Sequence, residues 1–301
     1  MSSSNKVFIY NSHETDRNSA DDLKELFSSN QIFAAKPDVT LSDFNSNFSG
    51  LCRPTFVVPG GAAMRMAVNL QPKMQTIQDA IKQHYHYISS CAGAFLGTKN
   101  AYVFDNSHGT NENKTAFVDS DYMFSTQDIL DPDAYIGDIN DYDAIGPFYP
   151  DDHYLGKAKK LYMPYRVNLQ VTTLDKSLAQ LYVSGAGFFR NDHLPKTAEI
   201  VATYSPDSSY SFNLPNGKKT FETLPAMIRR FPTEDKGAVF LSGTHIETCV
   251  PNSKFLRFFQ EPTQHSHALS AAEYNNFCKE QTETRADIEL LLRTTLSGNG
   301  I

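Results

Sequence analysis

Three short apolar runs in the first ninety residues end abruptly in small or turn-forming residues. Val7–Tyr10 leads into a polar loop, Thr55–Val58 into Pro-Gly-Gly, and Tyr85–Ser90 into a cysteine. Runs of this length between turn signals are typical of buried strands. Helical spacing follows the first two, in Ser19–Phe27 and Leu70–Gln83, with Ser19 as the expected N-cap. This alternation predicts an α/β protein with a mostly parallel sheet and helices on both faces.

The rest of the chain has a different character. Residues 105–160 are polar and lack periodicity, β-type runs dominate from Tyr165 onward, and the C-terminal part has helical spacing. Ile32–Ala35 is a further candidate strand near the N-terminus. We find no repeat or linker, and therefore expect a single domain over residues 1–301. It would carry an inserted loop and β-rich region at about 105–225 and C-terminal helices at about 252–296.

Charge and composition argue against several classes of partner. The 27 Lys and Arg against 34 Asp and Glu give a net charge of −7, which disfavours nucleic acid and anionic lipid. No apolar run reaches the roughly 18 residues of a membrane helix, and the N-terminal run is too short for a signal-peptide core. We expect a cytoplasmic protein that binds a small-molecule substrate or ligand, without nucleic-acid or membrane partners.

Metal and cofactor sites are not expected either. The four cysteines contain no CxxC pair, which favours reduced thiols over a disulfide scaffold or a zinc site. His84 and His86 would share one face of a strand, but no third ligand follows at a suitable spacing. The four cysteines are Cys52, Cys91, Cys249 and Cys278.

The segment around Cys91 has the pattern of a nucleophile elbow. An apolar run ends in two serines, and Ala-Gly-Ala follows the cysteine. A nucleophile on a sharp strand-to-helix turn needs small neighbours, because the backbone there is strained and close to other chain. A helix N-terminus would also favour the reactive thiolate. The alternative is a buried core cysteine, which is common after an apolar strand.

A base and its orienting carboxylate are available later in the chain. His245 and Glu247 follow the β-type run Ala238–Leu241 and the small residues Ser-Gly-Thr. A thiol nucleophile needs a base, and the base needs an orienting group. If both runs are strands of one parallel sheet, their carboxyl ends meet at one edge. Ordinary loop residues are the alternative for His245 and Glu247.

The glycine turn after Thr55–Val58 could bind a developing oxyanion. The N–H groups of Gly60 and Gly61, with that of Ala92, would point at the reacting oxygen, and glycines would leave the approach open. A simple turn is the alternative.

Together these segments resemble the class I glutamine amidotransferase-like family. The match is closer to the amidotransferase-like domain at the N-terminus of some biotin–protein ligases, which also occurs as a stand-alone protein. The resemblance spans roughly residues 5–260 and depends on motifs that occur in the family's order. Two positions depart from the pattern, with Ser89 at the elbow's first glycine and Ile246 between the histidine and the glutamate. The motifs are Val57-Val-Pro-Gly-Gly61, Cys91-Ala-Gly-Ala-Phe95, Gly146-Pro-Phe148, Tyr182-Val-Ser-Gly-Ala-Gly-Phe188 and Leu241-Ser-Gly-Thr-His-Ile-Glu247.

The resemblance implies a flavodoxin-like sheet and a Cys91–His245–Glu247 catalytic triad. It leaves two functions open. One is a cysteine-nucleophile hydrolase or amidotransferase acting on an amide or related acyl group, with an unidentified synthetase or ligase partner possible. The other is a non-catalytic module that binds a small molecule or regulates a partner.

The long segment between Cys91 and His245 must leave the sheet edge and return to it. Long loops without regular structure are uncommon unless they are functional or disordered, and the Tyr and Phe content argues against disorder. We therefore expect residues 105–190 to cover the site, with Gly185 and Gly187 close to the substrate. The alternative is that the segment only extends the sheet.

Overall fold

A computed structural model of the 301-residue chain shows a central sheet flanked by helices. The structure describes residues 5–44, 53–61, 66, 69–70, 85–98, 100–103, 115–117, 124–125, 143–146, 165–182, 188–189, 194, 196–204, 210–214, 217–221, 223–234, 236–258 and 271–298.

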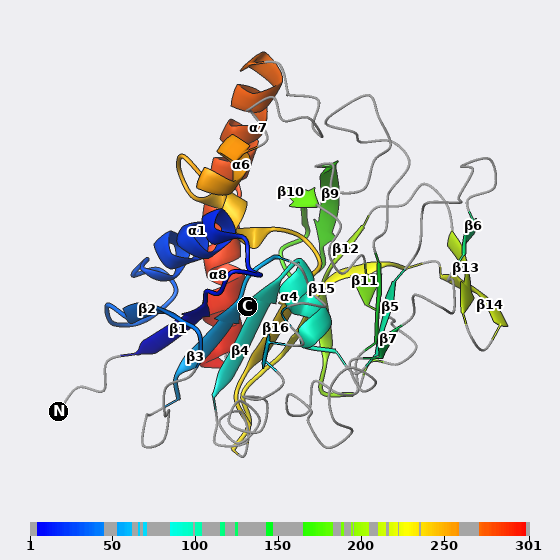
Figure 1. The fold of residues 1–301 in the computed structure, drawn as a ribbon, viewed down its shortest axis with the longest axis horizontal. Helices are drawn as coiled ribbons and strands as arrows, with labels where there is room; N and C mark the ends of the chain where they lie inside the picture. Colours follow the sequence, from blue (N-terminus) through cyan, green and yellow to red (C-terminus); the bar gives the residue numbers. More distant parts are fainter. Residues whose placement is uncertain are drawn as a thin grey trace.

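The central sheet has nine strands in the order β10-β9-β12-β15-β16-β4-β3-β1-β2 (Figure 1). The strands from β16 to β2 form a parallel half, and those from β10 to β15 an antiparallel half that joins it through the antiparallel β15–β16 pair. The parallel half consists of β1 (Lys6–Tyr10), β2 (Asp38–Ser42), β3 (Thr55–Val58), β4 (His86–Ser90) and β16 (Val239–Ser242). The antiparallel half consists of β9 (Tyr165–Val171), β10 (Lys176–Tyr182), β12 (Glu199–Tyr204) and β15 (Pro225–Arg230).

The α/β class is correct, but the expectation of a mostly parallel sheet is wrong. Four neighbouring pairs of the nine-stranded sheet are parallel and four are antiparallel. The β9–β10 pair is antiparallel because a short turn at residues 172–175 joins the two strands, and a turn that short can only reverse the chain. The region expected as an insertion at about 105–225 therefore extends the main sheet through β9, β10 and β12.

Side chains alternate between two cores, one on each face of the sheet. Along β1, Val7 and Ile9 join one core, while Phe8 and Tyr10 pack in the other. The first core includes α1 (Arg17–Phe27) and α8 (Arg285–Ser297), and the second includes α4 (Ala92–Leu96). Successive side chains of a strand point to opposite faces of the sheet, and helices cover both faces. The sheet is therefore buried on both sides.

The first helix begins earlier than expected. Its N-cap is Asp16, whose carboxylate accepts hydrogen bonds from the backbone N–H groups of Asn18 (2.8 Å) and Ser19 (3.0 Å). Aspartate caps as well as serine does, so the sequence could not separate the two candidates. The candidate strand at Ile32–Ala35 is also wrong, because these residues form turns and bends and β2 begins only at Asp38.

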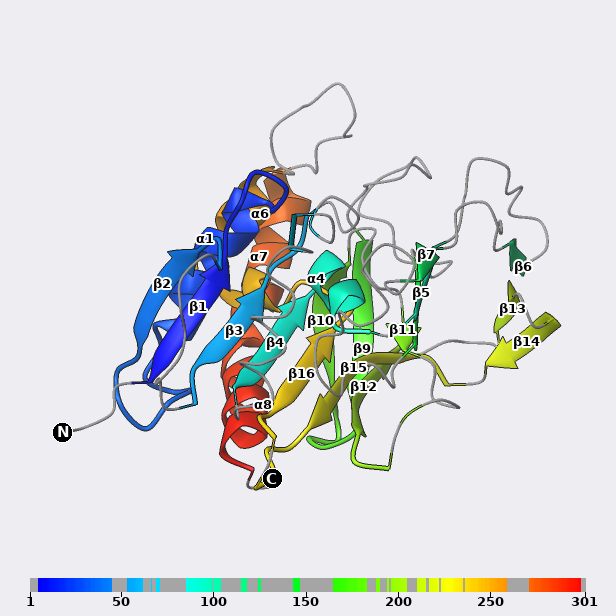
Figure 2. The ribbon, with the colours of Figure 1, turned by 60° about the horizontal axis from the view of Figure 1, so that its bottom comes forward.

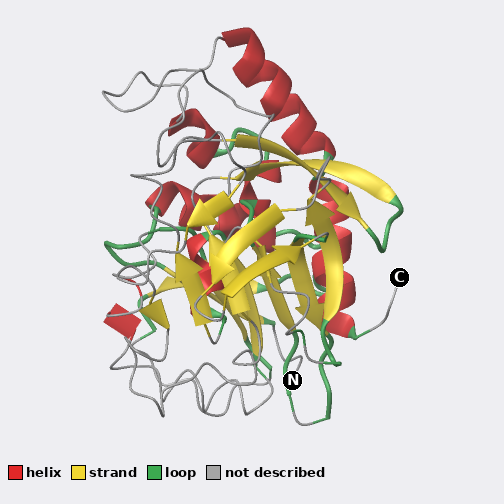
Figure 3. Ribbon diagram, turned by 90° about the vertical axis from the view of Figure 1, so that its right-hand side faces the viewer, coloured by secondary structure: helices red, strands yellow, loops and turns green. Residues whose placement is uncertain are grey.

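The C-terminal helices lie beside α1 in Figure 1, and Figure 3 shows the strands with helices next to them. The C-terminal helices follow a short 3-10 turn, η6 (Ile246–Cys249), and consist of α6 (Lys254–Phe258), α7 (Ala271–Glu283) and α8. Among the described helices, none has the length and apolarity needed to cross a membrane.

Two small sheets lie on the side of the molecule away from α1 (Figures 1 and 2). One contains β5 (Asn100–Val103), β7 (Phe124–Ser125), β8 (Asp143–Gly146) and β11 (Phe188–Phe189). The other contains β6 (Thr115–Phe117), β13 (Tyr210–Leu214) and β14 (Gly217–Phe221).

Candidate active site

Three neighbouring parallel strands direct the sequence motifs to one edge of the sheet. β3, β4 and β16 are adjacent and run in the same direction, so the chain leaves all three at the same edge. The glycine turn follows β3, Cys91 follows β4, and His245 follows β16. The structure therefore brings together segments that lie more than 150 residues apart in the sequence, such as Ser90 and Glu247, whose side chains are hydrogen-bonded.

Cys91 occupies a strained backbone position between β4 and α4. Its φ of 51° and ψ of −120° are unusual for a residue with a side chain. Its N–H donates to the carbonyl of Ser242 at the end of β16 (2.8 Å), which ties the turn to the neighbouring strand. The following Gly93 has no room for a side chain, since a Cβ there would lie 2.3 Å from the carbonyl oxygen of Val58. This is the geometry expected of a nucleophile elbow.

Gly60 marks the point where the thiol and the imidazole meet. A Cβ on Gly60 would lie 2.9 Å from Cε1 of His245, 3.3 Å from Cβ of Cys91 and 3.6 Å from its Sγ. The side chains of Cys91 and His245 therefore converge on the backbone of the glycine turn. Only glycine leaves this space open.

The glycine turn is held in place by backbone contacts with the loop that follows β1. The carbonyl of Gly60 accepts a hydrogen bond from the N–H of Asp16 (3.0 Å), and Gly61 forms a bridge with Thr15. Within the described part of the chain, the N–H groups of Gly60, Gly61 and Ala92 donate to no backbone carbonyl.

His245 is buried and oriented by three contacts. Its Nδ1 lies 2.7 Å from Oε1 of Glu247, its backbone N–H donates to the carbonyl of Leu181 (2.8 Å), and its ring stacks on Phe255 with 4.3 Å between centroids. The other ring nitrogen, Nε2, makes no hydrogen bond of ordinary geometry to any described residue, but the Cys91 thiol lies close enough to interact with the ring. The imidazole is thus held on the Nδ1 side, and Nε2 is the nitrogen left for a proton transfer.

The electrostatics of the site favour a charged histidine. Burial lowers the pKa of His245, but the neighbouring side chains of Cys91 and Glu247 outweigh burial and hold this pKa well above its ordinary value. Burial raises the pKa of Glu247, but His245 and the Ser19 hydroxyl outweigh it and lower this pKa. The buried pair therefore favours an imidazolium next to a carboxylate.

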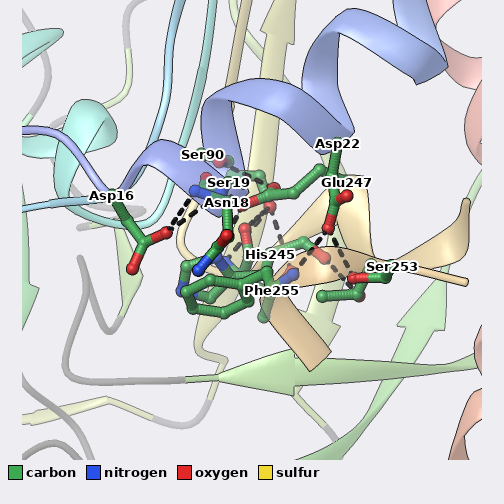
Figure 4. A network of polar contacts seen from close by, with 12 residues as sticks. Asp16, Asn18, Ser19, Asp22, Ser90, His245, Glu247, Ser253 and Phe255 are labelled. Carbon is green, nitrogen blue, oxygen red and sulfur yellow. Dashed lines mark hydrogen bonds and ion pairs between the residues drawn. The ribbon is translucent and has the colours of Figure 1, made fainter. Parts of the chain in front are cut away.

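Glu247 is itself anchored by two serines whose roles the sequence pattern does not reveal (Figure 4). The hydroxyl of Ser19 on α1 donates to Oε1, and the hydroxyl of Ser90 on β4 donates to Oε2 (2.9 Å). Glu247 is completely buried, so these bonds compensate for the lost hydration of its carboxylate. In the sequence, Ser19 fits a helix cap and Ser90 fits a small elbow residue, so neither signals a bond to Glu247.

One more residue, Tyr204 in the antiparallel half, interacts electrostatically with Cys91. Burial raises the pKa of the Tyr204 phenol, and the nearby Cys91 raises it further. Tyr204 is the last residue of β12. Sequence periodicity indicates this strand but gives no reason to single out its last residue.

The sequence also offers candidate residues other than these. Gly185 and Gly187, and most of the segment expected to cover the site, lie outside the described residues, so that expectation stays a prediction. His86 is a buried sheet residue whose Nδ1 accepts a hydrogen bond from the N–H of Ala238 (2.9 Å). In the part of the chain that the structure describes, no group of three or more His, Cys, Asp and Glu side chains could hold a metal ion.

Comparisons with known proteins found little. No family model matches the sequence, and no curated protein matches it. Among solved structures, the chain is similar to a ThuA-like protein from Bacteroides uniformis, with 10% sequence identity and a TM-score of 0.40 over 95% of this chain and 93% of that one. A likeness this distant carries no argument about function.

Proposed function

We propose that this protein is a cysteine-nucleophile hydrolase or amidotransferase that acts on an amide or related acyl group of a small molecule. Cys91 would be the nucleophile, His245 the general base and then acid, and Glu247 the group that orients His245. The observation that carries the proposal is the convergence of Cys91 and His245 on Gly60, with Cys91 in a strained turn and His245 paired to a buried carboxylate.

The proposed reaction has two steps. Nε2 of His245 takes the proton from the Cys91 thiol, which gives the imidazolium that the buried Glu247 carboxylate favours, and the Sγ thiolate attacks the acyl carbon. The oxyanion that forms is held by the N–H groups of Gly60, Gly61 and Ala92. His245 then gives its proton to the leaving amine, and a thioester remains on Cys91. Water, deprotonated by His245, attacks the thioester and releases the acid and the thiol.

The proposal includes kinship with class I glutamine amidotransferase-like proteins, and with the biotin–protein ligase N-terminal domain in particular. The order of the parallel half supports it. From the edge of the sheet inward, this half runs β2-β1-β3-β4-β16, which is the flavodoxin-like order of five parallel strands. In such sheets ligands bind beyond the carboxyl ends of the strands, where Cys91 and His245 lie.

A second candidate function is a non-catalytic module that binds a small molecule or regulates a partner. Burial favours it, because Cys91 is 4% exposed and His245 only 2%. A substrate reaches a thiol this deep only if the segments around it open or leave a channel.

An acyl probe separates the two functions. p-Nitrophenyl acetate should acylate Cys91 and release a burst of nitrophenol close to one equivalent per chain, followed by slower turnover. The burst should vanish in Cys91→Ala and persist in Cys278→Ala, since Cys278, on α7, belongs to none of the proposed catalytic motifs. A wild-type protein without a burst contradicts the enzyme and favours the binding module.

A further inference from the structure

Helix α1 presents two buried polar side chains toward the candidate site, one helical turn apart. Ser19 and Asp22 are spaced i, i+3 and therefore lie on the same face of the helix. Ser19 is fully buried and Asp22 is 2% exposed. Neither belongs to the proposed triad, yet both contact the residues that hold His245 (Figure 4).

The contact of Ser19 fixes the carboxylate partner of His245. Its hydroxyl donates to Oε1 of Glu247, the same oxygen that lies 2.7 Å from Nδ1 of His245. The direction of the Glu247 carboxylate, and with it the plane of the imidazole, thus depends on where α1 places Ser19.

Asp22 fixes the start of α6. Its Oδ2 accepts hydrogen bonds from the Ser253 hydroxyl (2.5 Å) and the Phe255 N–H (2.9 Å), and its Oδ1 accepts one from the Lys254 N–H (2.9 Å). Both oxygens are used, so only a carboxylate satisfies all three donors. The first N–H groups of α6, which have no partner within the helix, obtain one in this way.

The anchored segment carries the ring that stacks on His245. The rings of Phe255 and His245 lie 4.3 Å apart between centroids at an interplanar angle of 23°. Because the Phe255 N–H is bonded to Asp22, a change at Asp22 moves the backbone from which this ring projects. An aromatic face next to an imidazole stabilises its protonated form.

We propose, on the basis of the function proposed above, that Asp22 is a positioning residue that holds the Phe255 ring against His245, while Ser19 one turn earlier holds Glu247. Helix α1 thus orients the base both through its hydrogen-bonded partner and through its stacked ring. Among the described residues, the charged groups near Asp22 include Glu247 from η6, Lys254 from α6 and Asp21 on its own helix.

A neighbouring residue provides a matched control. Asp21 also links α1 to α6, through its carboxylate and the ammonium of Lys254 (2.8 Å), but this pair lies toward solvent and reaches no backbone N–H of α6. If any link between the two helices were sufficient, Asp21 and Asp22 would matter equally.

The test is the titration of His245, observed by NMR in protein labelled at histidine Cε1. A His245→Gln variant identifies its signal among the nine histidines. Phe255→Leu should shift the signal, by removing the ring current, and lower the titration midpoint by about half a pH unit. Asp22→Asn should shift the His245 signal and its titration midpoint in the same direction as Phe255→Leu does. Ser253→Ala, which removes one of the three hydrogen bonds to Asp22, should shift them by less. Asp21→Asn should leave both unchanged.

These measurements decide whether Asp22 positions the Phe255 ring. A folded Asp22→Asn protein with the wild-type signal and midpoint overturns the positioning role. If Asp22→Asn does not fold, Ser253→Ala decides, and an unchanged His245 signal there overturns it as well. The titration requires no turnover, so a wild-type chain without an acyl burst fails the proposed function while this inference can still hold.

Discussion

The two halves of the central sheet differ in what they bring to the candidate site. The parallel half places Gly60, Cys91 and His245 at one edge, because β3, β4 and β16 all end there. The antiparallel half contributes backbone carbonyls, those of Leu181 and Ala226, and the phenol of Tyr204. Successive antiparallel strands end at opposite edges, so their termini cannot converge in the same way. The parallel strands carry the residues that are proposed to react, and the antiparallel strands contribute hydrogen-bond acceptors and the Tyr204 phenol.

The largest expected effect tests this division directly. His245→Asn should slow acylation of Cys91 by p-nitrophenyl acetate by about 100- to 10,000-fold, because the thiol loses its base. Tyr204→Phe should leave the rate within about threefold, because the phenol transfers no proton in the proposed mechanism. Stopped-flow release of nitrophenol measures both, with circular dichroism to show that each variant is folded. Equal losses in the two variants would end the distinction between the halves.

A smaller effect is expected from two glycines that both lack room for a side chain. Gly60→Ala places a methyl group against Cε1 of His245 and should slow acylation by about 10- to 100-fold, because the base is displaced. Gly97→Ala meets Cδ2 of Leu241 at 2.7 Å and Cε1 of Tyr87 at 3.0 Å, both in the core. This variant should lose about 1–3 kcal/mol of stability and keep its acylation rate.

Thermal unfolding and acylation rates of the two glycine variants form the comparison. If Gly97→Ala slows acylation as much as Gly60→Ala does, crowding in general is responsible, and the contact with His245 is not.

The sequence could predict the part of the site that depends on strand ends. Cys91, Gly60 and the His245–Glu247 pair each follow an apolar run, and parallel strands bring such ends together whatever their distance in sequence. The antiparallel half was not predictable in this way, because the apolar residues of β9 and β12 fit either strand direction. For this reason a mostly parallel sheet was expected, whereas half of the observed sheet is antiparallel.

The supports of the site could not be read from the sequence. Ser19 lies 228 residues from Glu247, and its spacing fits a helix cap equally well. Asp22 resembles any acidic residue near a helix start, although it is bonded to a segment 231 residues away. Such pairs depend on how α1 packs against α6 and η6, and local patterns contain no information on that packing.

The smallest effect concerns the pH dependence of stability at Asp22. Burial is the main cause that raises the pKa of this carboxyl from 3.8 to about 6, with the Glu247 charge as a lesser one. A raised pKa favours folding most at low pH, and the contribution is lost as pH rises through the folded value. Relative to Asp22→Asn, the wild-type protein should therefore lose about 1 kcal/mol of unfolding free energy between pH 5 and pH 7.

Urea unfolding at the two pH values measures this difference, and the surface residue Asp21 serves as the control. A wild-type protein that gains stability relative to Asp22→Asn as pH rises would contradict a raised pKa for the Asp22 carboxyl.

The most direct test of the central claim, that His245 activates Cys91, is the alkylation rate of each cysteine near neutral pH. Iodoacetamide labelling resolved by mass spectrometry compares Cys91, which is 4% exposed, with Cys278, which is half-buried. Exposure alone would make Cys278 the faster thiol. We predict that Cys91 reacts faster, and that His245→Asn removes this advantage. A Cys91 that reacts more slowly than Cys278, at a rate unchanged by His245→Asn, would contradict the claim.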